Sequence, residues 1–448
     1  MTGSTADHAS SVAPRALFVT RELLDESMYG SGAYVLDILR FLQRKGWEIE
    51  FCLLPVSRPG NFRQDLPEAY QSIGRVSIHH GFVVGRALFF WPGLPSLMLS
   101  WPRALYMRLP QIFKQAFRRL RSDLRSARAG DTRATTHAPL PTGYALTNET
   151  DFLTTRCLEF KPEVVIANYA WLANSLAGVP REIGAIRLVL TCDILHQRQE
   201  QYDRLGLVPD INGWTRAAES SVLANADVLI GIQDEDSRIL REMAPGAAVV
   251  TLPISVAPIT ATGAPVAGRC LFVGSQAEHN IISLRWFLQE IWPIVLKQFP
   301  ASTLHVVGGV CNEFSPIYPN TLLLGNLPSI DGEYANAEVC VIPVVVGSGL
   351  KIKLLEAMAH GRASVVTSTG AYGVQAVCAP AVLMADTPAA FADAIATLFR
   401  DPDLRSKMES RAHQVVLASF AADVVYAPLL KLIDERRSIQ TRGVERSA

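Results

Sequence analysis

Short apolar runs alternate with helix-length segments along most of this 448-residue chain, and this alternation constrains its fold more than any other feature. The first run, at 16–20, is followed by apolar residues at helical spacing up to Gly46, and a second run follows at 48–54. A strand, a helix and a strand in this order favour parallel pairing in an α/β sheet. We expect further strands at 164–167, 188–191 and 227–232.

The alternation restarts after SVAPITATGAPVAG at 255–268, an uncharged stretch whose composition is typical of an extended linker. Here we expect strands at 270–274, 303–308 and 321–325, and a helix over about 280–298. The pattern predicts an α/β protein with two Rossmann-like, doubly wound parallel-sheet domains facing a central cleft. In such sheets ligands bind outside the carboxyl ends of the strands.

These signals divide the chain into five expected parts. They are a disordered tail at 1–14, an amino-terminal acceptor-side domain at 15–254 with an insert at about 80–150, a linker at 255–268, a carboxyl-terminal donor domain at 269–420, and a final helix and tail at 421–448. Packing of that last helix against the amino-terminal domain is one option.

The composition of the chain limits which partners and which cellular compartment we expect. The 42 basic and 42 acidic residues balance, so nucleic acid is not an expected partner. The seven cysteines are scattered and include no C-x-x-C pair, which favours reduced cytosolic thiols over disulfides or a zinc site. The first fourteen residues contain no apolar stretch typical of a secretion signal, and the uncharged stretch at 87–102 is broken by prolines and too short to span a membrane.

The strongest local signal for chemistry lies at 341–373, where a buried strand, a glycine turn at 347–349 and a helix over about 350–360 follow one another. Unpaired N–H groups at such a helix start bind anions. Lys351 and Lys353 add charge in the first turn, where the helix dipole favours acids. We interpret this combination as an anion site; the alternative is a solvated lysine pair on a surface helix.

Glu356 follows Lys353 by three residues on an otherwise apolar helix. A carboxylate in such surroundings needs a partner. One interpretation is an ion pair with Lys353 along the helix. The other is a carboxylate that accepts both hydroxyl groups of a ribose.

This segment resembles retaining glycosyltransferases of the group-one type, glycosyltransferase family 4 and its relatives, in which a Glu-x7-Glu stretch leads into E-A-M-A-x-G. Here the second glutamate is Glu356 and the tail reads EAMAHGRASVV. The blocks at 271–295 and 219–240 resemble further parts of the family in the right order. The first glutamate is replaced by Ser348, which matches the family variant with G-S-G-x-K-x-K.

The resemblance implies a GT-B fold and a hexosyltransferase-like enzyme of polysaccharide biosynthesis. It would move a sugar, with retention of configuration, from a nucleotide-diphosphate donor to a glycan, glycolipid or other glycoconjugate. The leaving diphosphate takes the acceptor's proton in this class, so no metal and no cofactor besides the donor are expected. The implied donor-binding residues are Gly274, Asn280, Leu327, Gly347, Ser348, Gly349, Leu350, Lys351, Lys353 and Glu356. Lys351 and Glu356 are also catalytic candidates.

Two segments of the amino half are candidates for acceptor contact. Gly30, Ser31 and Gly32 precede the first helix but do not complete a dinucleotide fingerprint, so a simple turn and a cleft-facing loop both remain open. The segment TCDILHQRQ at 191–199 follows a buried strand and places Asp193, His196 and Arg198 at its carboxyl end. Resemblance to a D-x-x-x-x-R element of related transferases implies roles for Asp193 and Arg198. We expect Asp193 and His196 to be catalytic, with a purely structural histidine as the alternative.

Two other functions remain open on the same fold. One is a sugar-nucleotide epimerase, and the other is an inactive, transferase-like partner subunit, which the missing first glutamate permits.

The insert carries strong positive charge in an otherwise neutral chain. Residues 103–128 hold eight basic residues and one acid, with basic and apolar side chains in two stripes at helical spacing. We predict that Arg118, Arg121 and Arg125 contact an anionic membrane surface, as an enzyme with a lipid-linked acceptor would need. The protein would then be cytoplasmic and peripheral on the inner face of the membrane. In the alternative, the aromatic residues pack under the helix and the charges are solvated.

Overall fold

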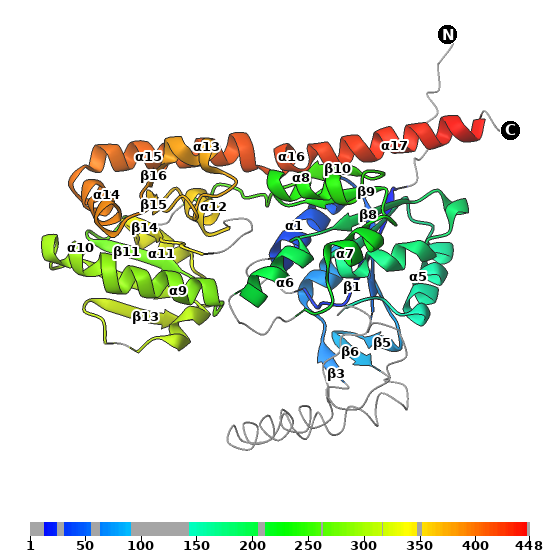
Figure 1. Ribbon diagram of the computed structural model, residues 1–448, viewed down its shortest axis with the longest axis horizontal. Helices are drawn as coiled ribbons and strands as arrows, with labels where there is room; N and C mark the ends of the chain where they lie inside the picture. Colours follow the sequence, from blue (N-terminus) through cyan, green and yellow to red (C-terminus); the bar gives the residue numbers. More distant parts are fainter. Residues whose placement is uncertain are drawn as a thin grey trace, which may run out of the picture. The chain divides into compact units, whose positions relative to one another are not determined.

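The computed structural model describes most of the chain as two compact units (Figure 1). The described residues are 13–24, 31–54, 63–90, 143–204, 211–260, 263–315, 317–346 and 352–445. By contacts, the amino-terminal unit comprises Met1–Met28, Leu42–Leu229 and Arg241–Ala248, and the carboxyl-terminal unit comprises Tyr29–Phe41, Ile230–Leu240 and Val249–Ala448.

The first sheet has seven strands in the order β10-β9-β8-β7-β1-β2-β4. Their bounds are β1 Arg15–Thr20, β2 Glu48–Leu53, β4 Arg75–Ile78, β7 Val164–Asn168, β8 Ile186–Leu190, β9 Val228–Gly231 and β10 Ala248–Thr251. The strand β1 pairs in parallel with both β2 and β7. Its residues Ala16 to Val19 are fully buried, as expected for a strand covered on both faces.

Helical segments connect these strands. They are α1 Ser31–Arg44, α2 Glu68–Ile73, α5 Thr147–Phe160, the 3-10 segments η1 Ala170–Gly178 and η2 Arg181–Ile183, α6 Leu195–Arg204, α7 Arg216–Leu223 and α8 Asp234–Met243. The strands expected from the apolar runs are confirmed.

A small antiparallel sheet was not expected from the sequence. It contains β3 Arg63–Asp65, β5 Gly81–Val84 and β6 Ala87–Phe90 in the order β3-β6-β5. The strands β5 and β6 lie at the start of the region that we interpreted as an insert, whereas β3 precedes it. Residues 91–142, which follow β6, lie outside the described part of the chain.

The second sheet has six strands in the order β13-β12-β11-β14-β15-β16, and all neighbours pair in parallel. Their bounds are β11 Arg269–Val273, β12 Thr303–Val307, β13 Thr321–Gly325, β14 Val339–Ile342, β15 Ser364–Val366 and β16 Val382–Met384. Chain order and strand order reverse at β11, which has β12 on one side and β14 on the other. Two doubly wound parallel sheets confirm the predicted fold class.

Helices join these strands and extend to the carboxyl end. They are α9 Glu278–Trp286, the π segment η3 Phe287–Ile291, α10 Trp292–Gln298, η4 Gly309–Glu313, α11 Asp331–Asn336, α12 Ile352–Ala359, α13 Gln375–Cys378, η5 Ala379–Ala381, α14 Pro388–Arg400, α15 Pro402–Val415, the π segment η6 Val416–Phe420, α16 Ala422–Val425 and α17 Ala427–Glu445. The expected helix over 280–298 is confirmed as α9, η3 and α10, with Leu284, Phe287 and Ile291 in the core.

The last helical run contains the one segment of the described chain that is long and apolar enough, by length and composition, to cross a membrane. This run is Pro402–Ser438, and a third of its most apolar window is buried inside the protein. Ala421 has an extended backbone that interrupts the helical geometry. Tyr426, just beyond it, is fully buried, donates to the Asp37 carboxylate at 2.5 Å and packs its ring against Phe41 at 5.1 Å.

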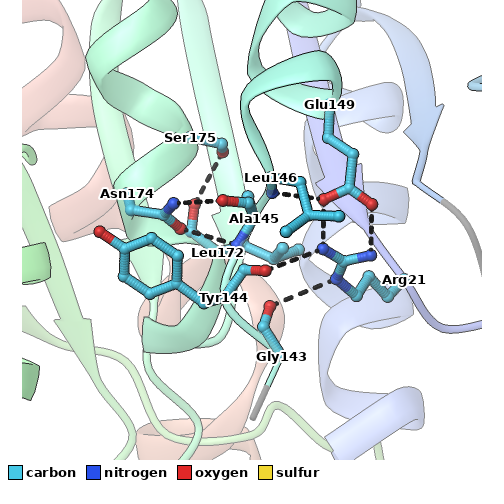
Figure 2. Close-up of polar contacts among 9 residues, drawn as sticks. All are labelled: Arg21, Gly143, Tyr144, Ala145, Leu146, Glu149, Leu172, Asn174 and Ser175. Carbon is cyan, nitrogen blue, oxygen red and sulfur yellow. Dashed lines mark hydrogen bonds and ion pairs between the residues drawn. The ribbon is translucent and has the colours of Figure 1, made fainter. Parts of the chain in front are cut away.

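A buried ion pair fixes the chain near Gly143, where the described part resumes (Figure 2). Arg21, directly after β1, donates to both carboxylate oxygens of Glu149 and to the carbonyls of Gly143 and Tyr144. Glu149 also accepts the Leu146 N–H at 2.7 Å, which completes the amino end of α5. The Glu149 side chain is only 3% exposed, so its charge depends on these donors.

Removal of this carboxylate should therefore destabilise the amino-terminal unit. Glu149→Gln leaves the Arg21 guanidinium without its charge partner, and we expect a loss of about 3 kcal/mol in the free energy of unfolding. The matched control is Glu68→Gln, whose ion pair with Arg86 is exposed on both sides and should change stability by less than about 1 kcal/mol. Urea unfolding of both variants measures the difference, and equal midpoints would contradict this role of the Arg21–Glu149 pair.

Candidate functional site

A small pocket opens in the second sheet at the point where its strand order reverses. It has a volume of about 10 Å³, and side chains from β11, β14, α11 and α12 form its wall. These side chains are Leu271, Val273, Tyr334, Cys340, Val341, Ile342, Lys353 and Ala357. Such a switch point is where doubly wound sheets bind ligands, because the two flanking connections diverge there.

Two glycines bring the turns after β11 and β12 into contact beside this pocket. Gly308 has φ +103°, and a Cβ there would lie 2.2 Å from the carbonyl oxygen of Gly274. The Gly274 N–H donates to Val307 at 2.9 Å, and its carbonyl accepts from Val310 at 3.2 Å. No side chain other than hydrogen fits at 308, so these turns approach more closely than ordinary residues would allow.

Lys353, in the first turn of α12, reaches the start of α9. Its Nζ donates to the Asn280 Oδ1 and lies 5.8 Å from the centre of the Phe272 ring. Asn280 is 1% exposed, and its Nδ2 donates to the carbonyl and the hydroxyl of Ser275, each at 3.0 Å. The structure thus places three residues, Lys353, Asn280 and Gly274, around the end of β11.

Glu356 lies one turn further along α12, with Tyr334 of α11 as its partner. The Tyr334 hydroxyl donates to Glu356 Oε2 at 3.0 Å. Burial raises the pKa of Glu356 to about 7, although the Tyr334 hydrogen bond and the Lys353 charge act in the opposite direction. The carboxyl group therefore changes its charge near neutral pH.

His360 supports Tyr334 from the end of α12. The two rings stack with centroids 4.2 Å apart and an angle of 12° between their planes. Burial lowers the pKa of His360 to about 4, against the attraction of Asp331 at 3.6 Å. A neutral imidazole thus holds the phenol ring whose hydroxyl reaches Glu356. Neither Tyr334 nor His360 was expected from the sequence.

The central part of the predicted anion site is outside the described residues. Gly347, Ser348, Gly349, Leu350 and Lys351 fall there, and α12 is described from Ile352 onward. The described Leu327 follows β13, and its side chain is half-buried. The structure therefore brings together Gly274, Asn280, Lys353 and Glu356 from the predicted set.

In the first sheet, the predicted residues after β8 are held by contacts with charged side chains. Asp193 Oδ2 accepts from Arg198 Nη1 at 3.0 Å. His196 is 4% exposed, and its Nδ1 lies 2.7 Å from Glu219 Oε2. Glu219, fully buried, also accepts the backbone N–H groups of Leu195 and His196 at the start of α6. This geometry fixes the imidazole ring and gives it a structural partner that the sequence did not reveal.

Another carboxylate lies near this group. Burial raises the pKa of Glu22, which follows β1, and the charge of Arg198 acts against this. The Glu22 carbonyl accepts from the Tyr70 hydroxyl at 2.7 Å. The only sequence signal for Glu22 was its place just beyond a buried strand.

Only some of the remaining predicted site residues lie in the described part of the chain. Gly30 is outside the described part, whereas Ser31 and Gly32 begin α1. Arg118, Arg121 and Arg125 also lie outside it. Among the described residues, no group of three or more histidine, cysteine, aspartate or glutamate side chains is arranged to hold a metal ion.

Comparison with known proteins relates the second sheet to a defined family. Residues 267–401 match the family described as "Glycosyl transferases group 1". The chain is 25% identical over 173 residues to an uncharacterized 44.6 kDa protein in the cps region of Klebsiella pneumoniae. That alignment covers 36% of this chain and 45% of the relative, so it spans about half of the relative's length.

Solved structures resemble nearly the whole chain. Sucrose-phosphate synthase from Thermosynechococcus elongatus superposes with a TM-score of 0.60 at 13% identity, covering 95% of this chain and 100% of that one. TarM of S. aureus gives 0.62 at 10% identity, covering 94% and 99%. Anabaena Alr3699/HepE, solved with UDP and glucose, gives 0.57 at 11% identity, covering 94% and 99%. Together with the two parallel sheets, these similarities establish the GT-B fold.

The raised pKa of Glu356 predicts a specific dependence of stability on pH. The folded protein holds this proton up to about pH 7, whereas the unfolded chain releases it near 4.5. The contribution of Glu356 is therefore fully present below about pH 4.5 and is lost as the pH rises to 7, a change of about 3 kcal/mol. Tyr334, Lys353 and Asp331 are the ionisable groups that act on it, and the neutral His360 stacks on Tyr334.

Glu356→Gln removes this titration. Relative to wild type, the free energy of unfolding of the variant should increase by about 2 kcal/mol or more between pH 5 and pH 8. Urea unfolding without ligand measures this difference. The exposed Glu278→Gln serves as the control and should follow the wild-type profile. Parallel profiles for Glu356→Gln and wild type would show that burial does not raise this pKa.

Proposed function

We propose that this chain is a glycosyltransferase that moves a sugar from a nucleotide-diphosphate donor to a glycan or other glycoconjugate acceptor, with retention of configuration. The observation that carries the proposal is the pocket lined by β11, β14, α11 and α12, inside the segment that matches group 1 glycosyltransferases. Lys353 forms part of its wall, and Glu356 is hydrogen-bonded to the wall residue Tyr334. The solved complex of HepE with UDP and glucose supports a nucleotide sugar as the donor.

In this mechanism the start of α12 receives the diphosphate. Lys351 and Lys353 supply positive charge, and Gly347 to Leu350 supply backbone N–H groups. The Asn280 side chain, itself held by Ser275, sets the position of the Lys353 ammonium. As the bond between the sugar and the diphosphate breaks, negative charge grows on the phosphate oxygen, and these groups stabilise it without the need for a divalent ion.

Glu356 would hold the ribose of the donor. Its carboxyl group changes charge near pH 7, so the ionised form is available to accept hydroxyl groups at neutral pH. The Tyr334 hydroxyl occupies one carboxylate oxygen and fixes the rotation of the group. Gly274 and Gly308 let the turns after β11 and β12 pack against each other, which fixes the backbone at these strand ends.

On the acceptor side, Asp193 and His196 remain the candidates for contact with the reacting hydroxyl group. Glu219 orients the His196 ring through Nδ1, which leaves Nε2 as the atom for substrate. Arg198 holds Asp193 at 3.0 Å.

Incubation with a panel of nucleotide sugars in the absence of an acceptor distinguishes the proposal from its two alternatives. A transferase hydrolyses its donor slowly and releases the nucleoside diphosphate. An epimerase of the same fold converts the sugar nucleotide into its isomer, and an inactive partner subunit leaves every sugar nucleotide unchanged. Release of a nucleoside diphosphate supports the proposal, and either of the other outcomes overturns it.

Replacement of the phosphate-binding lysines should reduce turnover. Lys351→Ala and Lys353→Ala each remove a charge-assisted contact worth about 1.5–3 kcal/mol, so we expect a loss of at least about tenfold in donor turnover. Lys297→Ala, an exposed lysine of α10, is the control and should retain activity. Thermal unfolding of the three variants separates a lost contact from a lost fold, and near-normal turnover in both site variants contradicts their role.

The small sheet supports a membrane surface as a further partner. Phe82 and Val84 project from the same face of β5 and are 56% and 61% exposed. The chain leaves β6 directly into the apolar residues 91–102 and the basic residues 103–128. Exposed apolar groups on β5, followed in the sequence by a stretch of about +7 charge, would suit a bilayer with anionic headgroups.

Flotation with liposomes tests this partner. We expect binding to vesicles that contain phosphatidylglycerol but not to pure phosphatidylcholine, and release in 1 M salt, where charges are screened within about 3 Å. Substitution of Arg118, Arg121 and Arg125 by glutamate should abolish binding, and Phe82→Ser should weaken it. Equal binding to neutral vesicles, or to neither kind, contradicts an electrostatic membrane contact.

A further inference from the structure

A buried polar pair at the end of β9 has no role in the donor site described above. Gln233 follows β9 and is 6% exposed, and Asp236 in the first turn of α8 is 8% exposed. The Gln233 Nε2 donates to Asp236 Oδ1 at 3.1 Å. The Gln233 Oε1 is buried and, within the described part of the chain, has no hydrogen-bond partner.

The amino end of α8 does not require this amide. The backbone carbonyl of Gln233 accepts the Ser237 N–H at 3.0 Å, which begins the helix. The amide NH2 is engaged by Asp236, and this contact leaves the carbonyl oxygen turned away from the carboxylate. A buried acceptor without a donor is unfavourable, so one left in this state points to a missing partner.

A glycine lies against this oxygen. Gly373, in the turn after β15, has φ +82°, and a Cβ built on it would lie 3.1 Å from Gln233 Oε1. Both residues belong to the carboxyl-terminal unit. Any other residue at 373 would place a side chain against the amide oxygen, in a backbone conformation that disfavours it. Tyr372, next to this glycine, is 40% exposed.

The surroundings select a neutral donor group. Asp234, Glu235 and Asp236 fill the first turn of α8, so a phosphate or carboxylate ligand would be repelled there. Burial raises the pKa of Asp236 to about 6, and one oxygen of this carboxyl group already accepts from the Gln233 NH2. A hydroxyl group can donate to the amide oxygen without carrying charge into this site. Its place at the carboxyl end of a parallel strand is where such sheets bind ligands.

We propose that Gln233 Oε1 accepts a hydrogen bond from a hydroxyl group of the carbohydrate substrate, and that Asp236 acts as a positioning residue by fixing the orientation of the amide. This inference rests on the proposed glycosyltransferase function and adds a specificity-determining contact to it. The hydroxyl group belongs either to the donor sugar or to the acceptor sugar, and the two arms of the test separate these sources.

The first arm measures binding to the intact protein by calorimetry. The probes are UDP, GDP, ADP and dTDP, and then UDP-glucose, GDP-mannose, ADP-glucose and dTDP-glucose. If the hydroxyl group is on the donor sugar, Gln233→Ala should bind the nucleoside diphosphate as wild type does and lose about tenfold or more in affinity for the nucleotide sugar. Gln298→Ala, which changes an exposed glutamine in the same unit, should match wild type in both measurements.

The second arm uses p-nitrophenyl glucoside, galactoside and mannoside in the presence of the bound nucleoside diphosphate. If the hydroxyl group is on the acceptor, Gln233→Ala should lose affinity for the glycoside and keep that for the nucleotide sugar. Gly373→Ala, which covers the amide oxygen with a methyl group, should cause the same selective loss. Thermal unfolding of each variant shows whether the fold is retained.

Asp236→Asn tests the positioning role. Asparagine can donate to the Gln233 oxygen, so the amide turns its NH2 toward the ligand. We therefore expect this variant to favour the deoxyfluoro analogue of the recognised sugar position over the parent hydroxyl compound, because fluorine accepts but does not donate. A merely structural Asp236 would leave this preference unchanged.

The outcomes separate the two claims. Nucleoside diphosphate binding in wild type, together with unchanged affinity of Gln233→Ala for all the nucleotide sugars and glycosides, overturns the hydroxyl contact alone. Absence of nucleoside diphosphate binding in wild type overturns the proposed function and this contact with it.

Discussion

The hydrogen bond between Lys353 and Asn280 is the interaction on which the candidate donor site depends. Lysine in the first turn of a helix opposes the helix dipole, so the ammonium group needs acceptors around it. Asn280 supplies one, and Ser275 fixes the asparagine from its other side. The pair joins α12 to α9 across the switch point and holds a positive charge at the mouth of the pocket.

The same strand arrangement positions the polar side chains in both sheets: a central strand has one parallel neighbour on each side. In the second sheet, β11 lies between β12 and β14, and the connections on its two sides diverge around the pocket. In the first sheet, β1 lies between β2 and β7, and the Thr20 hydroxyl accepts from the Asn168 amide at 3.1 Å across that point. Glu22, Asp193 and Arg198 follow strands of this sheet. The strand order thus explains why charged groups from distant parts of the sequence occur at these sheet ends.

Much of the fold could be predicted from the sequence, because parallel strands buried on both faces give short, continuous apolar runs. The runs at 16–20 and 270–274 are of this kind. The antiparallel β3-β6-β5 sheet was missed because its strands are short and partly exposed, and the Gly85-Arg86 turn lies within a segment interpreted as an insert. The interruption of α9 to α10 by a π segment also has no clear sequence signal.

Individual site residues could be predicted, but their partners could not. Lys353 and Glu356 stand out against an apolar helix, whereas the contact of Lys353 with Asn280 joins residues 73 positions apart. Tyr334 lies in a short helix without a motif, and the resemblance at 219–240 implied no role for Glu219. Both residues become important because folding brings them to Glu356 and His196.

The central claim is that the end of β11 and the start of α12 bind a nucleoside diphosphate. Hydrogen–deuterium exchange of the intact protein, with and without each of UDP, GDP, ADP and dTDP and with a chelator present, tests it directly. The account predicts that at least one of these ligands slows exchange in peptides covering 274–280 and 352–360. Protection confined to other strand ends, such as 20–24 or 191–196, or no protection by any of the four, would contradict it.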